Sequence, residues 1–239
     1  MKKPKGRVIA IVASAGGGRR FGEGSRDKVF ASLNGKPLLY HTLKNLTASA
    51  KVKYIVLVVS GRSIDSARSL IDRFGFDKVK YIVTGGKRRT DSVFNALGAL
   101  KDVIKREDFI LVHDGARPLA APGLIDRTIA LAAVSGAAIA AIPVTSTIKR
   151  ADGRGRVIST VDRKGLWEIQ TPQVFRAGIL SAAYGNGKRH LLNRATDDAS
   201  LVEGLGRTVR ISPGDSTNIK ITTKSDLKLA EALIKGRAK

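Results

Sequence analysis

A glycine-rich stretch followed by cations lies near the start of the chain. It reads SAGGGRRFGEGSRDK at 14–28 and follows a run of apolar residues. Glycines let backbone N–H groups approach phosphate oxygens, and the arginines with Lys28 can neutralise a triphosphate. No Gly-Lys-Ser/Thr ends the stretch, and Phe21 occupies the third glycine place of a dinucleotide-binding turn. The stretch therefore predicts a nucleotide-binding loop that is neither a Walker loop nor a dinucleotide fingerprint.

Three later segments carry further polar side chains. In HDGARP at 113–118, Asp114 follows a strand-like run, where it could hold Mg²⁺ or orient a substrate hydroxyl. The alternative is that Asp114 caps a turn and pairs with Arg117. TPQVF at 171–175 predicts a rigid, hydrogen-bonding loop, and Lys220 is a lone cation of a kind that is more often solvated than catalytic.

Apolar runs rich in β-branched residues alternate with stretches of helical spacing. The runs lie at 7–13, 54–59, 81–83, 109–113 and 137–144, and the helical stretches at 38–46, 64–74, 92–100 and 124–134. This alternation is typical of βαβ units, so it predicts an α/β fold with a doubly wound, mostly parallel sheet. Ligands bind beyond the carboxyl ends of the strands in such sheets, where the polar segments above lie.

The alternation breaks at residues 145–161, which carry no helical period. Asp152-Gly153 within them predicts the positive-φ turn of a β-hairpin. This hairpin has no core of its own to cover, so we expect it to project as a surface flap or as a dimerisation arm. Residues 218–222 read as a strand, and Ser225 is the expected N-cap of a C-terminal helix.

Length and composition narrow the classes of protein. A chain of 239 residues with 43% hydrophobic residues predicts a single domain over 1–239. No apolar run approaches the ~18 residues of a membrane span, so we expect a cytoplasmic protein. The absence of cysteine excludes thiolate catalysis and disulfides, and three histidines without an HExxH spacing argue against a histidine-rich metal site.

The charge balance is strongly basic, with 43 Lys and Arg against 20 Asp and Glu, a net charge of +23. Such a surface attracts polyanions, which makes nucleic-acid binding an alternative function. Aromatic residues make up only 5% of the chain, whereas single-strand binding needs exposed aromatic platforms. A solvated basic surface is therefore the simpler interpretation.

Seven segments, taken together and in order, resemble the 2-C-methyl-D-erythritol 4-phosphate cytidylyltransferase family over nearly the whole chain. They are AGGGRRF at 15–21, GGKRRTDSV at 85–93, HDGARP at 113–118, TVDRKGLW at 160–167, QTPQVF at 170–175, TDDAS at 196–200 and NIKIT at 218–222. The resemblance implies a Rossmann-like nucleotidyltransferase fold and transfer of CMP from CTP to the sugar alcohol phosphate. The position of Asp114 predicts Mg²⁺ as cofactor, and the projecting hairpin predicts a homodimer built through this arm.

The resemblance also implies a role for particular residues. The positions that would bind the nucleotide are Ala15, Gly16, Gly18, Gly86, Ser92 and Gly115. Those that would act in the transfer are Arg20 and Lys28 on the triphosphate, and Arg163 and Lys220 on the attacking phosphate. The substrate pocket would be completed by Asp114, which is also the candidate Mg²⁺ contact, and by Arg117, Thr147, Thr171 and Thr196.

Some residues depart from the pattern of this family. Ala13-Ser14 stands where Pro-Ala is common, Gly115 where Ala is usual, and Asp198 where Glu is common. Asp27 places a carboxylate next to Lys28, which we expect to weaken the effect of that cation.

The resemblance leaves the sugar phosphate open. A ribitol 5-phosphate cytidylyltransferase would share the CTP loop, Asp114 and Lys220. Arg163 and Thr147 favour methylerythritol phosphate as the substrate.

Overall fold

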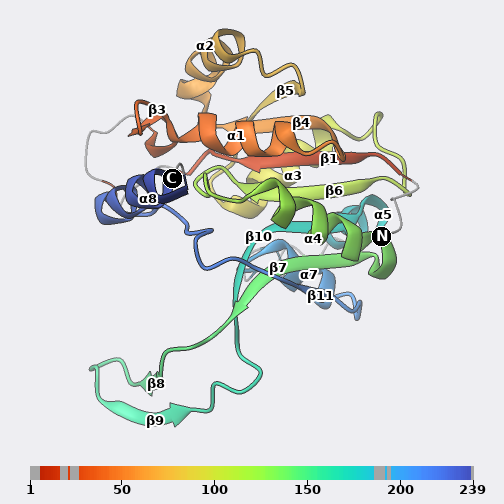
Figure 1. Cartoon of the computed structure of the whole chain (residues 1–239). Coiled ribbons are helices and arrows are strands. Elements are labelled where there is room, and N and C mark those ends of the chain that lie inside the picture. The colour runs from red at the N-terminus through yellow and green to blue at the C-terminus, as the bar shows by residue number, and fades with distance from the viewer. Residues whose placement is uncertain (1–5, 17–20, 22–26, 186–191, 193–194, 238–239) are drawn as a thin grey trace.

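The chain forms a twisted sheet with helices packed on both of its faces (Figure 1). The computed structural model describes residues 6–16, 21, 27–185, 192 and 195–237. Within these residues the sheet has seven strands in the order β11-β7-β10-β6-β1-β4-β5. The predicted strands are confirmed as β1 (Val8–Ala13), β4 (Val52–Val59), β5 (Val79–Thr84), β6 (Phe109–Asp114) and β7 (Ala137–Pro143).

The predicted helices and the doubly wound arrangement are also confirmed. The helices are α1 (Leu38–Ala48), α2 (Ile64–Phe74), α3 (Arg89–Ala99) and α4 (Pro122–Ser135). Val8, Ala10 and Val12 of β1 enter one hydrophobic cluster with α1, α2 and α4, whereas Ile9 and Ile11 enter another with α3. Successive strand residues face opposite ways, so this apolar strand is buried only because helices cover both faces.

One strand of the sheet runs against the others, and the sequence did not predict it. β10 (Trp167–Arg176) is antiparallel to both β6 and β7, so the predicted loop at 171–175 was wrong. Thr171 and Gln173 are buried polar residues whose partners lie elsewhere in the fold. The register against β7 shifts next to Pro172, where a proline can enter a strand without removing a ladder hydrogen bond.

The predicted hairpin is present and projects from the body (Figure 1). It consists of β8 (Ile148–Ala151) and β9 (Val157–Val161). The predicted turn was wrong, because positive φ occurs at Gly155 (φ 78°) and not at Gly153. The backbone N–H of Asp152 donates to the carbonyl of Arg156 at 3.0 Å, which encloses a three-residue loop with a left-handed residue at its end.

The remaining elements are short or lie late in the chain. Residues 218–222 pair with no strand in the described part of the chain, so the strand predicted there was wrong. Ile221 instead donates its N–H to the carbonyl of Ala116 at 2.8 Å. The other elements are β2 (Ser32–Leu33), β3 (Lys36–Pro37), β11 (Arg210–Pro213), α5 (Ala177–Gly185), α7 (Asp198–Glu203) and 3-10 turns at Lys28–Phe30 and Gly61–Ser63.

None of the helices in the described ranges is long and apolar enough to cross a membrane. The cytoplasmic location stays a prediction from the sequence.

The C-terminal helix α8 (Lys224–Arg237) begins with a reciprocal cap. Thr223 Oγ1 accepts the N–H of Asp226 at 3.2 Å, and the Asp226 carboxylate accepts the N–H groups of Thr222 and Thr223 at 2.8 Å. The predicted N-cap, Ser225, was wrong because this residue already lies in the first turn. The cap ties the 218–222 segment to the start of the helix.

We expect Asp226→Asn to remove about 1 kcal/mol of stability at neutral pH, the usual cost of losing such a cap. Hydrogen bonds from Thr222 lower the pKa of Asp226 from 3.8 to about 2. Because the folded-state pKa is the lower one, this stability is present above the ordinary pKa and disappears as the pH falls toward about 2. Urea unfolding of both proteins at about pH 6 and about pH 2.5 measures the difference. An equal difference at both values would contradict the assignment.

Candidate active site

A cavity opens where the carboxyl ends of β1 and β6 meet the first turn of α3. Its volume is about 570 Å³, and parallel pairing of the two strands places Ala13 opposite Asp114 beside it. The predicted site residues that line it are Ala15, Gly16, Lys28, Gly86, Ser92, Asp114 and Lys220. Segments far apart in the sequence therefore meet at the sheet edge where α/β folds bind ligands.

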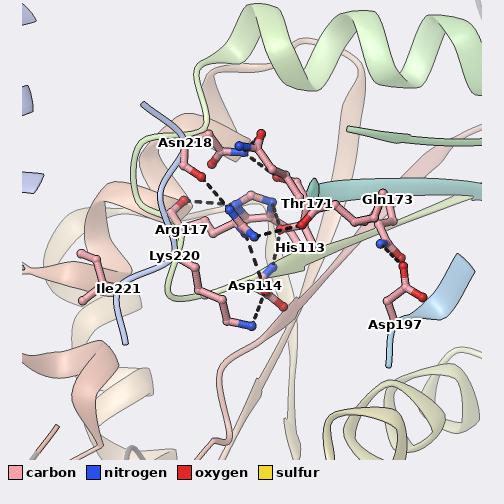
Figure 2. Close-up of polar contacts among 12 residues, drawn as sticks. His113, Asp114, Arg117, Thr171, Gln173, Asp197, Asn218, Lys220 and Ile221 are labelled. Atoms are coloured by element: carbon pink, nitrogen blue, oxygen red, sulfur yellow. Dashed lines mark hydrogen bonds and ion pairs between the residues drawn. The ribbon is translucent and has the colours of Figure 1, made fainter. Parts of the chain in front are cut away.

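Asp114 is the centre of a charged network in this cavity (Figure 2). Its Oδ2 lies 2.7 Å from Lys220 Nζ and 3.8 Å from Arg117 Nε, and its Oδ1 accepts a hydrogen bond from Arg89 Nε at 3.0 Å. Burial raises the pKa of Asp114, but Arg89 and Lys220 more than reverse this and hold it well below its usual range. The carboxylate is therefore ionised at neutral pH and fixes the Lys220 ammonium at the cavity wall.

Lys28 also lines the cavity, and its Nζ donates to the carbonyl of Ile221, the residue after Lys220, at 2.8 Å. The expectation that Asp27 weakens this cation is wrong. The Asp27 carboxylate is buried and accepts hydrogen bonds from Ser63 Oγ at 2.6 Å and Arg62 Nη2 at 2.8 Å, as well as from Ser60. Its charge is thus compensated by Arg62 and by the two serine hydroxyls.

Gly86 lines the cavity, whereas Gly115, which was also predicted to bind the nucleotide, follows Asp114 without lining it; the chain packs closely at both glycines. A Cβ atom on Gly86 would lie 2.3 Å from Asp91 Cβ, and one on Gly115 would lie 2.0 Å from Ser14 Oγ. Gly86 N–H donates to Ser92 Oγ at 3.1 Å, which holds the loop before α3 in place. A larger side chain at either glycine would push these backbone segments apart.

Arg117 and Thr171 lie behind Asp114 and do not line the cavity (Figure 2). Thr171 Oγ1 accepts the N–H of Asp114 and donates to His113 Nδ1, both at 3.0 Å. Burial lowers the pKa of His113 to about 4, so its ring is neutral and its Nε2–H donates to the Arg117 carbonyl at 3.2 Å. Arg117 Nη1 donates to the carbonyl of Asn218 at 2.6 Å, which supports the segment that carries Lys220.

The other predicted residues are not brought to this cavity. Thr147 and Arg163 are exposed at the base of the hairpin, where Arg163 Nη1 donates to the carbonyl of Thr145. Thr196 is exposed just before α7 and does not line the cavity. Gly18 and Arg20 lie outside the described residues.

The sequence reasoning missed several residues that line the cavity. They are Ser14, Lys87, Arg88, Arg89 and Thr222. The signal for three of them was the run Lys87-Arg88-Arg89, the densest short cluster of cations, directly after a strand and before a helix. On sequence alone this run belongs to the solvated basic surface that the net charge predicts, because its position at the cavity depends on the order of strands in the sheet.

The cavity offers a divalent cation one carboxylate. No cluster of three or more His, Cys, Asp or Glu side chains occurs among the described residues. Of the described residues that line the cavity, Asp114 is the one acid. Mg²⁺ commonly binds through one or two carboxylates together with substrate phosphates and water, so Asp114 fits as a single protein ligand.

The doubly wound sheet, with a glycine-walled and cation-lined cavity at its edge, defines a Rossmann-like nucleotidyltransferase. The model of the family 2-C-methyl-D-erythritol 4-phosphate cytidylyltransferase matches residues 8–236. The chain belongs to this family, and the resemblance inferred from the seven motifs is confirmed.

Relatives agree with this assignment over nearly their whole length. The 2-C-methyl-D-erythritol 4-phosphate cytidylyltransferase of Pelotomaculum thermopropionicum is 45% identical over 232 residues, which cover 97% of this chain and 95% of that protein. That of Dehalococcoides mccartyi strain 195 is 44% identical over 229 residues, with 96% of each covered. The crystal structure of the enzyme from Thermus thermophilus gives a TM-score of 0.75 at 30% identity, with 95% of this chain and 98% of that chain covered.

Proposed function

We propose that this chain transfers CMP from CTP to 2-C-methyl-D-erythritol 4-phosphate, giving 4-diphosphocytidyl-2-C-methyl-D-erythritol and pyrophosphate. The observation that carries the proposal is the Asp114–Lys220 pair, 2.7 Å apart in a cavity lined by glycines and cations. A cavity of about 570 Å³ is of the size that buries a small ligand. Membership of the family favours this substrate over ribitol 5-phosphate and over nucleic acid.

In the transfer, an oxygen of the methylerythritol phosphate attacks the α-phosphorus of CTP in line. The new P–O bond forms as the bond to the bridging oxygen breaks, and pyrophosphate leaves with that oxygen. Lys28, together with Arg20, stabilises the negative charge on the triphosphate during this step. Lys220 and Arg163 orient the attacking phosphate. No covalent enzyme intermediate is needed, because positioning and charge neutralisation supply most of the catalysis.

The nucleotide lies along the glycine-walled side of the cavity. Backbone groups of Ala15, Gly16 and Gly18 cradle the phosphates. Gly86, Ser92 and Gly115 surround the cytosine and ribose, where small residues read a pyrimidine edge and exclude a purine. The close approaches at Gly86 and Gly115 support this role, since neither position has room for a Cβ atom. Arg117, Thr171 and Thr196 are proposed to complete the sugar phosphate pocket with Asp114.

Mg²⁺ is the proposed cofactor, with Asp114 as its ligand from this chain. When bound, the ion supplies positive charge to the phosphate oxygens of CTP. Asp114 is suited to this because its pKa is held low and the carboxylate stays charged. The same carboxylate holds Lys220, so it organises both the nucleotide and the attacking phosphate.

We also propose that the hairpin arm joins two copies of the chain. Five large apolar side chains along β8, β9 and the start of β10 are exposed, namely Ile148, Val157, Ile158, Trp167 and Ile169. Exposed apolar side chains of this kind favour burial against a partner. Arg163 and Thr147 lie at the base of the arm, away from the cavity of their own chain. A two-fold-related partner would bring them to the neighbouring site.

We expect pyrophosphate release when CTP, 2-C-methyl-D-erythritol 4-phosphate and Mg²⁺ are all present, with ATP and GTP much poorer donors. The physical reason is the proposed reading of a pyrimidine edge by the backbone at Gly86 and Gly115, where the chain packs too closely for a Cβ atom. A coupled pyrophosphate assay gives kcat/KM for each donor and acceptor. Faster turnover with ribitol 5-phosphate would contradict the proposed acceptor. Salt-sensitive nucleic-acid binding without transferase activity would contradict the proposed reaction itself.

A further inference from the structure

Arg89, the first residue of α3, joins two carboxylates that come from different parts of the fold. Its Nε donates to Asp114 Oδ1 at 3.0 Å, and its Nη1 donates to Asp198 Oδ2 at 2.6 Å. Arg89 lines the cavity, whereas Asp198 at the start of α7 is fully buried. Neither side chain has a role in the function proposed above.

Asp198 is itself held from its other side. The hydroxyl of Tyr184, on α5, donates to Asp198 Oδ1 at 2.6 Å. Burial, together with the charge of Asp198, raises the pKa of Tyr184, so this hydroxyl remains protonated and remains a donor. Each oxygen of Asp198 thus accepts a short hydrogen bond, and a buried carboxylate paired in this way has one orientation.

The geometry of Arg89 follows from its two partners. Burial alone lowers the pKa of Arg89, but the charges of Asp198 and Asp114 more than reverse this, so the guanidinium stays charged. The guanidinium is planar and its donors point in fixed directions. With Nη1 held by Asp198, the direction in which Nε meets Asp114 is therefore set.

We propose that Arg89 is a positioning residue for the transfer: anchored by Asp198, it holds the Asp114 carboxylate in the orientation that directs Lys220 at the attacking phosphate. This role rests on the proposed function. Asp114 divides its oxygens between the two cations, with Oδ1 to Arg89 and Oδ2 to Lys220. Without Arg89 the carboxylate can rotate and carry the Lys220 ammonium with it. A displacement of about 1 Å in such an arrangement can cost about 100-fold in rate.

The competing explanation is that the Arg89–Asp198 ion pair only stabilises the fold. A second ion pair in the chain, distant from the cavity, serves as the comparison. Arg7 and Asp108 form a partly buried pair at the amino end of β1, in which the carboxylate is buried, the Arg7 side chain is 34% exposed, and 2.6 Å separates Nη2 from Oδ2. That end of the strand lies opposite the cavity. Arg7→Met should therefore lower Tm and leave kcat/KM unchanged.

The test removes both charges of the Arg89–Asp198 pair, so that no buried charge is left without a partner. In Arg89→Met/Asp198→Asn, we expect kcat/KM for 2-C-methyl-D-erythritol 4-phosphate to fall about 10- to 100-fold. The Kd for CTP, measured by calorimetry without Mg²⁺ so that the proposed Asp114–Mg²⁺ contact does not contribute, and the Tm should stay near their wild-type values. Because Arg89 acts through Lys220, the same pair of substitutions should lower the rate no further in a Lys220→Ala chain.

Three outcomes would overturn the inference: wild-type kcat/KM in the double variant, a Kd for CTP weakened in parallel with the rate, or a further loss in the Lys220→Ala chain. If the double variant does not fold, Asp198→Asn decides, since it keeps the size of the side chain but removes its charge and one of the two oxygens that accept from Arg89 and Tyr184. A several-fold fall in its kcat/KM at unchanged Tm supports the role, and an unchanged rate overturns it. Absence of CTP binding by the wild-type chain would instead refute the proposed function.

Discussion

Lys28→Ala and Lys220→Ala should each lower turnover about 10²- to 10³-fold while the chain remains folded. This is the cost typical of removing one preorganised charge donor from a transition state. The two ammonium groups are held at the cavity by the Ile221 carbonyl at 2.8 Å and the Asp114 carboxylate at 2.7 Å. Pyrophosphate release at saturating CTP and 2-C-methyl-D-erythritol 4-phosphate measures the loss in kcat.

Lys51→Ala is the matched control for these two variants. Like Lys28, Lys51 donates its Nζ to a backbone carbonyl, that of Asp126 at 3.0 Å, but it lies at the amino end of β4, away from the cavity. Its turnover should equal that of the wild type. Thermal unfolding of all three variants checks that the fold is kept. Near wild-type kcat in Lys28→Ala or Lys220→Ala would remove that lysine from the mechanism.

The second large effect is expected when two inactive variants are mixed to test the hairpin arm, and it is a recovery of activity. Lys28→Ala and Arg163→Ala chains should each be nearly inactive alone, and about a quarter of wild-type site activity should reappear when equal amounts are refolded together. Random pairing makes about half of the dimers mixed, and in a mixed two-fold dimer one site carries both defects and the other carries none. The pyrophosphate assay before and after mixing measures the recovery.

A mixture of Lys28→Ala and Lys220→Ala chains is the control, because both lysines line the cavity of their own chain. Every site in its mixed dimers keeps one defect, so mixing should restore nothing. If Arg163 serves its own subunit, the first mixture will behave like this control. A monomeric mass by light scattering would contradict the arm independently.

Local patterns in the sequence were sufficient for most of the sheet and for the helices around it. The strands β1, β4 and β6 are buried on both faces of the sheet. Their sequences are therefore almost entirely apolar, and an apolar run of this length predicts a buried strand. The pattern failed at β10, where buried polar side chains and a proline resemble a loop. It also failed at 218–222, where side chains alternate as in a strand but the backbone pairs with the Ala116 carbonyl and not with a sheet.

Ordered motifs were sufficient for the family and for part of the cavity. Glycines and cations after strands indicate phosphate binding, and the order of seven such segments separates one family from other α/β proteins. That reasoning brought Lys28, Asp114 and Lys220 to one site, and the structure places all three there. It did not reach Arg89, because an arginine in a basic run has no local feature that tells a positioning residue from a solvated one.

The sequence by itself therefore determined the class of fold, the family and part of the cavity lining, since each depends on composition and spacing along the chain. The tertiary structure alone decided how charges are paired. Asp27 pairs with Arg62, whereas Asp114 meets Lys220 from a distant segment and Arg89 meets Asp198 across 109 positions of sequence. Such pairings follow from the order of strands and the packing of helices. Charge attraction falls with distance in space, which the order of residues along a chain does not specify.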